Sequence, residues 1–282
     1  MLLFQRKSDL QDHLKSIQGP LVSIGFVPTM GALHDGHLSL MSQSLAQNTY
    51  TVVSIFVNPT QFNNRADLDN YPRNLEQDIA LMETISSSLI LFAPEISEMY
   101  TDDAVAETYD FGGLECQMEG AFRPGHFDGV GTIVYRLFQS VCPTRAYFGE
   151  KDFQQLQIIR KLVEQKKLPI EIVACPIFRE ANGLAMSSRN ERLSTHQRAE
   201  AALIYKALQE AKDLFKKYPI ADIQQQIKTF FSTSSMFQLD YFDIADEETL
   251  VPSTTVETGV KYRAFIAVII DGVRLIDNIP LN

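Results

Sequence analysis

The sequence predicts an α/β protein in which a doubly wound, Rossmann-like parallel sheet is followed by a smaller α+β domain. Two patterns predict this fold. Up to Pro176, short apolar runs alternate with segments of helical periodicity, as parallel strands alternate with their crossover helices. After Pro176, two helical segments precede a series of strand-like segments, which is typical of an α+β domain. We therefore expect domains at residues 1–176 and 177–282.

The expected strands of the first domain are short and rich in β-branched or aromatic residues, as strands buried on both faces are. They are Leu21–Val27, Thr51–Val57, Ser88–Phe92, Arg145–Phe148 and Ile170–Ala174. Apolar residues recur at helical spacing in the helices expected between them, which are Leu38–Gln47, Leu75–Ile85, Val130–Val141 and Phe153–Val163. Ligands of such a sheet bind beyond the carboxyl ends of its strands.

The second domain is expected to contain two helices and three strands. The helices are Thr195–Lys217 and Ile220–Phe231, and the strands are Gln238–Ile244, Tyr262–Ile270 and Val273–Asp277. Either Ser194 or Thr195 can cap the first helix, because both side chains can accept a hydrogen bond from a free backbone N–H. Asp271-Gly272 predicts a two-residue type I′ hairpin turn between the last two strands.

Composition argues against several classes of protein. A formal net charge of −10 argues against a nucleic-acid or anionic-membrane partner. No apolar stretch approaches the about 18 residues that a membrane span needs, and no signal peptide is recognisable. Cys116, Cys142 and Cys175 show no metal-binding spacing, so we expect reduced thiols. We expect a cytoplasmic protein whose partners are small molecules.

The most informative segment is His34-Asp35-Gly36-His37, which lies between an expected strand and an expected helix. A helix N-terminus favours bound phosphate, because its first N–H groups lack partners and the positive end of the helix dipole lies there. The two imidazoles can add further donors to the same oxygens. The alternative is that both histidines lie in a surface turn and have no functional role.

Three other loops carry groups that suit a nucleotide and a small acid. The segment from Asn58 to Gln61 offers two amides for hydroxyls and a carboxylate. The segment 149–155 offers a permissive glycine, a cation for phosphate, a carboxylate for ribose and a glutamine one helical turn later. The segment 183–190 contains two serines and an arginine, which are parts of a mobile phosphate clamp. Each loop could also be an ordinary turn or a solvated helix end.

Four further residues are weaker candidates. Arg123 and His126 lie just before an expected helix and could contact substrate or phosphate, or form a structural turn. Glu76 and Asp78 are candidate Mg²⁺ ligands, although carboxylates are common on solvated helix faces.

Taken together, these segments resemble the pantoate–β-alanine ligase (pantothenate synthetase) family. The matching segments follow one another in the family's order and are residues 27–37, 53–62, 71–73, 123–130, 148–155 and 179–190. Phe178 is a mild departure, since the family more often has a smaller aliphatic residue there. The backbone at this position is expected to meet adenine, so the contact could survive the change.

The resemblance implies an enzyme that condenses (R)-pantoate with β-alanine to give pantothenate. ATP is the co-substrate, Mg²⁺ accompanies it, and a pantoyl adenylate forms before AMP is released. The resemblance also implies a homodimer formed through the first domain, which would bind nucleotide and pantoate. The second domain would act as a lid.

The resemblance also assigns roles to residues. Catalytic roles fall on His34, His37, Lys151 and Arg189. The implied ATP-binding residues are Met30, Gly31, Ala32, Leu33, His34, Asp35, Gly36, His37, Gly149, Glu150, Lys151, Asp152, Phe178, Met186, Ser187, Ser188 and Arg189. The implied pantoate-binding residues are Met30, Asn58, Gln61 and Gln155, and Gln61 would also lie at the β-alanine site.

Two other functions remain open at this point. The first is another HxGH-type nucleotidyltransferase, which would keep the nucleotide in its product. The amides of Gln61 and Gln155 argue against it, because a phosphorylated substrate would require more cations there. The second is a non-enzymatic nucleotide-binding module, against which the complete set of histidines, Lys151 and Ser187–Arg189 argues.

Overall fold

The computed structural model describes residues 1–62, 68–69, 71–100 and 104–282. The chain divides into two compact units. The first unit comprises Met1–Glu150 and Gln154–Pro176, and the second comprises Lys151–Phe153 and Ile177–Asn282. The division after Pro176 lies where the composition pattern changes, whereas residues 151–153 pack with the second unit and not with the strand that precedes them.

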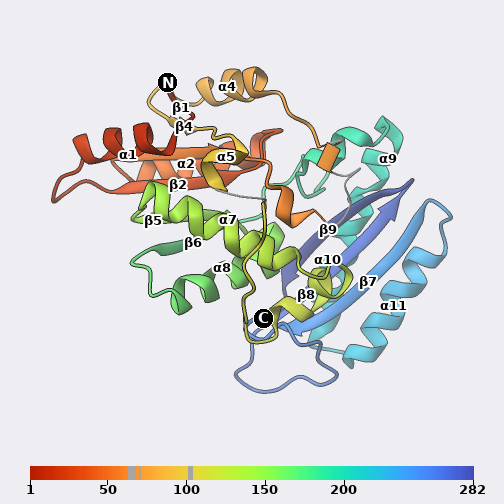
Figure 1. Ribbon diagram of the computed structural model, residues 1–282. Coiled ribbons are helices and arrows are strands. Elements are labelled where there is room, and N and C mark those ends of the chain that lie inside the picture. Colours follow the sequence, from red (N-terminus) through yellow and green to blue (C-terminus); the bar gives the residue numbers. More distant parts are fainter. Residues whose placement is uncertain (63–67, 70, 101–103) are drawn as a thin grey trace. The chain divides into compact units, whose positions relative to one another are not determined.

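The described residues of the first unit form a six-stranded parallel sheet with the strand order β1-β4-β3-β2-β5-β6 (Figure 1). The strands are β1 (Leu2–Phe4), β2 (Ile24–Thr29), β3 (Tyr50–Ile55), β4 (Ile90–Phe92), β5 (Arg145–Gly149) and β6 (Glu171–Cys175). From β2 the chain runs outward through β3 to β4, beside the edge strand β1, and then continues from β5 to β6 at the other edge. The switch point of this Rossmann-like sheet therefore lies between β2 and β5, which is where ligands bind in doubly wound sheets.

Helices connect these strands and cover the sheet. They are α1 (Lys7–Ser16), α2 (Asp35–Gln47), α4 (Leu75–Glu83), α5 (Ile96–Met99), α6 (Met118–Phe122), α7 (His126–Val141) and α8 (Phe153–Gln165). Short 3₁₀ helices lie at Pro59–Gln61, Leu114–Cys116 and Glu150–Asp152. One apolar cluster of this unit gathers side chains of β2, β3 and α2, including Val27, Val53 and Met41, each with an exposed fraction of 0%.

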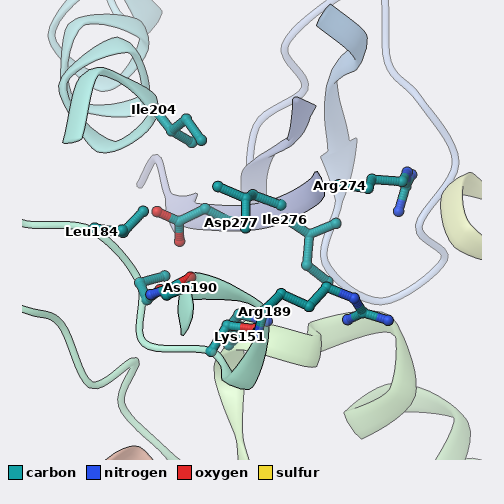
Figure 2. Close-up of a pocket in the computed structure, with 11 residues that line it drawn as sticks. Lys151, Leu184, Arg189, Asn190, Ile204, Arg274, Ile276 and Asp277 are labelled. Atoms are coloured by element: carbon teal, nitrogen blue, oxygen red, sulfur yellow. The ribbon is translucent and has the colours of Figure 1, made fainter. Parts of the chain in front are cut away.

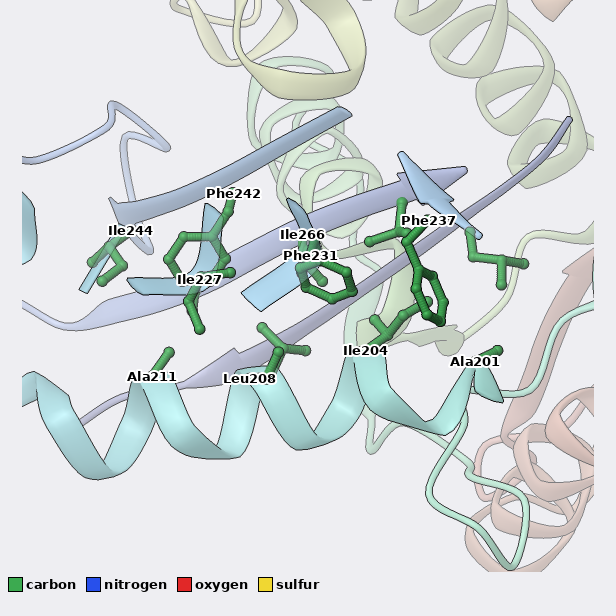
Figure 3. Close-up of a cluster of buried hydrophobic side chains, with 14 of the residues drawn as sticks. Ala201, Ile204, Leu208, Ala211, Ile227, Phe231, Phe237, Phe242, Ile244 and Ile266 are labelled. Carbon is green, nitrogen blue, oxygen red and sulfur yellow. The ribbon is translucent and has the colours of Figure 1, made fainter. Parts of the chain in front are cut away.

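The second unit packs helices on a three-stranded antiparallel sheet with the order β7-β8-β9. Its elements are α9 (Thr195–Glu200), α10 (Ala202–Phe215), α11 (Ile220–Ser232), β7 (Phe237–Asp246), β8 (Tyr262–Ile270) and β9 (Val273–Pro280). Figure 3 shows Ile204 and Leu208 of α10 and Ile227 of α11 meeting strand side chains such as Ile266 in the core. The predicted fold class, a parallel α/β sheet followed by a small α+β unit, is confirmed.

Several predicted elements differ from those observed. The predictions missed β1 and α1, which precede the first expected strand. The strand expected from Leu21 begins at Ile24, since Leu21 lies in a turn and is 94% exposed. The single helix expected at Thr195–Lys217 is two helices, α9 and α10, separated at Ala201. Ser194 caps α9, where its side chain accepts the N–H of Gln197.

The predicted hairpin turn is confirmed. Asp271 and Gly272 have φ angles of 48° and 76°, as both central residues of a type I′ turn require. The three cysteines are free thiols. Burial raises the pKa of Cys175 to about 12, so this thiol stays protonated and unreactive near neutral pH. Among the described residues, no helix combines the length and apolar character needed to cross a bilayer.

Candidate active site

His34 and His37 lie at the N-terminus of α2, just beyond the carboxyl end of β2. His34 is the N-cap residue, and its backbone N–H donates to Nδ1 of His37 at 3.3 Å. The two imidazole rings stack with their centroids 4.0 Å apart. The pair stands at the N-terminus of α2, where the helix dipole favours an anion.

The hydrogen bond between His34 and His37 determines what His37 can donate. A backbone N–H can only donate, so Nδ1 of His37 must accept and must lack a proton. In the neutral ring the proton is then on Nε2. Nε2 is the His37 atom that can donate to a phosphate oxygen.

The loop between β2 and α2 is held by one buried carboxylate. Gly31 and Ala32 both have left-handed backbone, with φ angles of 81° and 50°. This conformation directs two backbone N–H groups at Asp78 of α4, whose Oδ2 accepts from Ala32 at 3.1 Å and whose Oδ1 accepts from Leu33 at 2.8 Å. Asp78 is 4% exposed. Burial raises the pKa of this carboxyl above 3.8, and the hydrogen bonds from Leu33 and Ala32 oppose that rise.

These hydrogen bonds bear on the Mg²⁺ candidates. Both oxygens of Asp78 already accept backbone N–H groups, so this carboxylate positions the loop. Among the described residues, no group of three or more His, Cys, Asp or Glu side chains is arranged to hold a metal. Metal binding by Glu76 or Asp78 stays a prediction.

A second loop, after β3, carries the two predicted amides. Asn58 is 1% exposed, and its Nδ2 donates to Gly129 O at 3.0 Å and to Gln61 Oε1 at 3.3 Å. Its Oδ1 accepts the hydroxyl of Tyr100 at 2.6 Å. Nε2 of Gln61 faces the sulfur of Met30 at 2.8 Å. Asn58 therefore orients Gln61, and Gln61 lies beside Met30.

Arg123 and His126 support this second loop. Both side chains reach the backbone carbonyl oxygen of Gln61, with Arg123 Nη2 at 3.2 Å and His126 Nδ1 at 2.8 Å. A carbonyl only accepts, so His126 donates from Nδ1. Gly129 of α7 passes so close that a Cβ there would lie 2.5 Å from Thr60 O. The observed contacts of Arg123 and His126 are thus structural.

A cavity of about 550 Å³ opens beside the histidine loop in the first unit. It lies at the carboxyl ends of β3 and β4. Its lining includes Met30, Gly31, Phe56, Arg73 and Asp78. The size is that of small-molecule sites in general.

The loop after β5 also meets its expected requirements in part. A Cβ at Gly149 would find no atom of the described residues within 4 Å, so space is open there for a ligand. Gln155 is partly exposed on the first turn of α8, whereas the neighbouring Gln154 is buried and bonds the backbone of Leu114 and Gln117. Only Gln155 of this glutamine pair is therefore presented to solvent.

In the second unit, Lys151 and the segment around Ser187 line one small pocket (Figure 2). Ser187 caps the 3₁₀ helix Ser188–Arg192, with its Oγ accepting the N–H of Arg189 at 3.3 Å. The pocket measures about 10 Å³, roughly the space for a single water. Lys151 and Arg189 are both partly exposed. The structure thus brings together the predicted cations of segments 149–155 and 183–190.

The loop that leads to Ser187 is held by backbone hydrogen bonds between its own residues. Met186 N–H donates to Phe178 O at 2.9 Å, and Arg179 pairs with Ala185 as an isolated β-bridge. Phe178 is 41% exposed. The carbonyl oxygen of Phe178 therefore already accepts a hydrogen bond from within the chain. This bond restricts how the backbone at this position can contact a nucleotide base.

Sequence reasoning missed the residues that support the two segments on which Lys151 and Arg189 lie. Asn190 is 1% exposed and donates to Glu180 Oε1 at 2.7 Å, and Glu180 Oε2 accepts from Arg198 at 2.9 Å. Asp277 and Asn278 of β9 bond to Arg179 and to the backbone of Lys151. The signal that could have found them was two polar residues that follow the apolar run of an expected strand.

Comparisons with known proteins identify the family of this chain. The chain is 53% identical to the pantothenate synthetase of Flavobacterium psychrophilum, with all of both chains aligned. The pantothenate synthetase of Christiangramia forsetii is 52% identical, again over all of both chains.

Solved structures agree as well. The crystal structure of pantothenate synthetase from Thermus thermophilus has a TM-score of 0.90 at 39% identity, covering 100% of this chain and 99% of that one. A pantoate-β-alanine ligase from Francisella tularensis, complexed with "Beta-gamma ATP and Beta-alanine", has a TM-score of 0.80 at 32% identity, covering 100% of this chain and 98% of that one. The model of the family described as pantoate-beta-alanine ligase matches residues 2–280. The chain is therefore a member of the pantoate–β-alanine ligase family.

Proposed function

We propose that this chain condenses (R)-pantoate with β-alanine to give pantothenate, with ATP converted to AMP and pyrophosphate. The observation that carries the proposal is the stacked pair His34 and His37 at the N-terminus of α2, in a chain that matches the family over residues 2–280. The Francisella tularensis relative, whose structure contains a nucleotide and β-alanine, supports the same choice of substrates.

In the first step, a carboxylate oxygen of pantoate attacks the α-phosphorus of ATP. The bond from that phosphorus to the bridging oxygen breaks, which yields pantoyl adenylate and pyrophosphate. Negative charge gathers on the phosphate oxygens, so catalysis depends on positioning and on donors aimed at those oxygens. His34 and His37 would supply such donors at the α-phosphate, with Nε2 of His37 as the donor atom.

The leaving pyrophosphate requires cations. Lys151 and Arg189 would take the β- and γ-phosphates together with the hydroxyls of Ser187 and Ser188. The open space at Gly149 supports a ribose contact there, with Asp152 accepting from the ribose hydroxyls. Phe178 and Met186 would face the base.

Pantoate would lie against Gln61 and Met30. The fixed amide of Gln61 can bond the hydroxyls and carboxylate of pantoate, and Gln155 offers a second amide. The thioether of Met30 can pack on the dimethyl group. Asn58 would contribute by orienting Gln61, since its own amide already bonds to the protein.

In the second step, the amine of β-alanine attacks the acyl carbon of the adenylate. The bond from that carbon to the AMP oxygen breaks, and the amide of pantothenate forms. Gln61 would also contact β-alanine. The acyl adenylate makes this step possible because AMP is a far better leaving group than the hydroxide of a free carboxylate.

Mg²⁺ is expected to enter bound to ATP and to stay mainly on its phosphates. Magnesium in such sites keeps several waters and takes one or two protein carboxylates at most. We also propose a cytoplasmic location. We further propose a homodimer formed through the first unit, and light scattering on the purified protein would test whether the protein is a dimer.

One assay tests the proposed activity. AMP should appear only when pantoate, β-alanine, ATP and Mg²⁺ are all present, and pantoate alone should support exchange of labelled pyrophosphate into ATP. A nucleotidyltransferase of the HxGH type would instead release pyrophosphate without amine-dependent AMP. Absence of both signals from folded protein would refute the proposal.

A further inference from the structure

Two neighbouring residues of β9 hold the two segments of the second unit that carry its predicted phosphate-binding groups. Asp277 is 4% exposed and Asn278 is 1% exposed. Adjacent residues of a strand point to opposite faces of the sheet. One strand therefore supports one segment from each face.

Asp277 holds the loop that leads to Ser187. Its Oδ2 and Oδ1 accept from Arg179 Nη1 and Nη2 at 2.6 and 3.0 Å. Arg179 also donates to Gly183 O at 3.0 Å, and its guanidinium lies 3.7 Å from the ring centroid of Tyr205. The fork of Arg179 thus ties this loop to β9.

Asn278 holds the segment that contains Lys151. Its Nδ2 donates to the backbone oxygen of Lys151 at 2.9 Å, and its Oδ1 accepts from Arg263 Nη1 at 2.6 Å. Arg263 can only donate, so it fixes which end of the Asn278 amide carries the oxygen. The donating end then faces Lys151, where the acceptor is a carbonyl. Both ends of this amide are therefore matched to their partners.

The ring of Phe153 completes the support of this segment. The guanidinium of Arg263 lies 3.9 Å from the centroid of the Phe153 ring, and the centroid of the Phe265 ring lies 5.9 Å from the same point. Arg263 is also paired with Glu247 at 2.8 Å. The segment 151–153 is thus fixed at its first residue by Asn278 and at its last by Arg263.

We infer that Asn278 is a positioning residue for adenylation, which fixes the backbone of Lys151 so that its ammonium group meets the phosphates of ATP. This inference rests on the proposed function. If the inference is right, loss of the Asn278 amide donor should misplace Lys151 and thereby slow the first half-reaction. The second half-reaction, in which pyrophosphate has already left, should not depend on it.

Asn278→Asp is the sharpest variant. It keeps the shape and an acceptor for Arg263, but places a carboxylate oxygen against Lys151 O in place of a donor. The matched control is Asn282→Asp, because Asn282 Nδ2 likewise donates to a backbone oxygen, that of Val260 at 2.8 Å, in the same unit. Asn278→Ala removes the donor without adding charge and serves if the aspartate variant fails to fold.

The half-reactions are measured separately. Pantoate-dependent release of pyrophosphate should fall on the order of 10–10²-fold in the Asn278 variants, the size of loss that misplacement by about 1 Å causes. Release of AMP from supplied pantoyl adenylate and β-alanine should stay within about twofold of the parent. In a Lys151→Ala background, Asn278→Asp should lower adenylation no further, since both changes act through one side chain.

Three results would overturn the inference. They are an Asn278→Asp protein that forms adenylate as fast as Asn282→Asp, an equal loss in both half-reactions, or a full additional loss in the Lys151→Ala background. If the unmodified protein makes no adenylate at all, the proposed function fails, and this inference fails with it. Normal turnover by the parent with any of the three results leaves the proposed function standing.

Discussion

The loop of the first unit that carries His34 and His37 is held in a different way from the segments of the second unit that carry Lys151 and Arg189. Around His34 and His37, the supports are hydrogen bonds from backbone N–H groups, two of them to the carboxylate of Asp78. Around Lys151 and Arg189, the supports include a buried ion pair and a buried arginine. In the first arrangement the carboxylate lies 45 residues along the chain from Leu33, whereas in the second Asn278 lies 127 residues from Lys151.

This difference has an energetic consequence. Removal of the Asp78 carboxylate would leave backbone N–H groups that water can reach in part, because Ala32 and Leu33 are only partly buried. Removal of one partner from a buried ion pair leaves the other charge without compensation. The second unit should therefore be the more sensitive to single substitutions in its supports.

The largest effect on stability should come from breaking the buried pair of the second unit. Asp277→Ala would leave the Arg179 guanidinium without its carboxylate, which typically costs about 3–5 kcal/mol. Urea denaturation would measure the loss. A matched control is Asp9→Ala, which removes the exposed partner of Arg6 and should change stability little. If both variants lost similarly little free energy of unfolding, the supports of the second unit would not be the more sensitive ones.

Both regions should matter equally for the chemical step. His37→Ala and Lys151→Ala should each lower adenylate formation on the order of 10²–10³-fold, about 3–4 kcal/mol, because each removes a donor to developing negative charge. Thermal unfolding should show both folds intact. Near wild-type adenylate formation by Lys151→Ala would remove the phosphate role of the second unit, and the same result for His37→Ala would remove that of the first.

Substitution of Gln155 should change the KM for pantoate and not the KM for ATP. Gln155→Ala should raise the KM for pantoate by about 3–10-fold, the loss of a neutral hydrogen bond, and leave the KM for ATP nearly unchanged. Steady-state kinetics with each substrate varied in turn would show this. A change confined to the KM for ATP would contradict the assignment of Gln155 to pantoate.

The smallest effect concerns pH. Because burial raises the pKa of Asp78 above its unfolded value, the folded protein takes up this proton at a higher pH than the unfolded chain. The free energy of unfolding of the parent, relative to Asp78→Asn, should therefore rise as pH falls through the folded-state pKa and decline again as pH rises. The gain should stay below about 1.4 kcal/mol per pKa unit.

Denaturation of both proteins at pH 7 and near pH 4 would reveal the sign of this change. Only the difference between parent and variant is informative, since the other titrating groups are shared. A difference that shrinks on acidification would show that the two backbone hydrogen bonds outweigh burial at Asp78.

The histidine region is largely predictable from sequence. The apolar run, the glycine and the two histidines 34 and 37 predict strand, tight turn and helix start, because each feature acts over a few residues. The support from Asp78 is not predictable in this way. A carboxylate on a helix looks the same in sequence whether it binds a cation or backbone N–H groups, so the pattern suggests a metal ligand and does not reveal the support of the loop that the structure shows.

The supports of the second unit are not predictable either. Nothing near Lys151 in sequence indicates that Asn278 will meet it, because that contact depends on how β9 pairs with β8. The helix break at Ala201 escapes prediction for a related reason: helical periodicity continues through the break, and only packing separates α9 from α10. Local patterns predict which residues would do chemistry, and long-range packing determines what holds them.

The contact between Lys151 and Asn278 spans 127 residues of chain. A ribosome adding about 5–20 residues per second needs roughly 6–25 s to proceed from one to the other. During that interval the parallel sheet of the first unit has been synthesised, but the strand that fixes Lys151 has not. The nascent chain therefore acquires the sheet of its first unit well before it can order Lys151, and we expect its competence for adenylation to arise late and abruptly during synthesis.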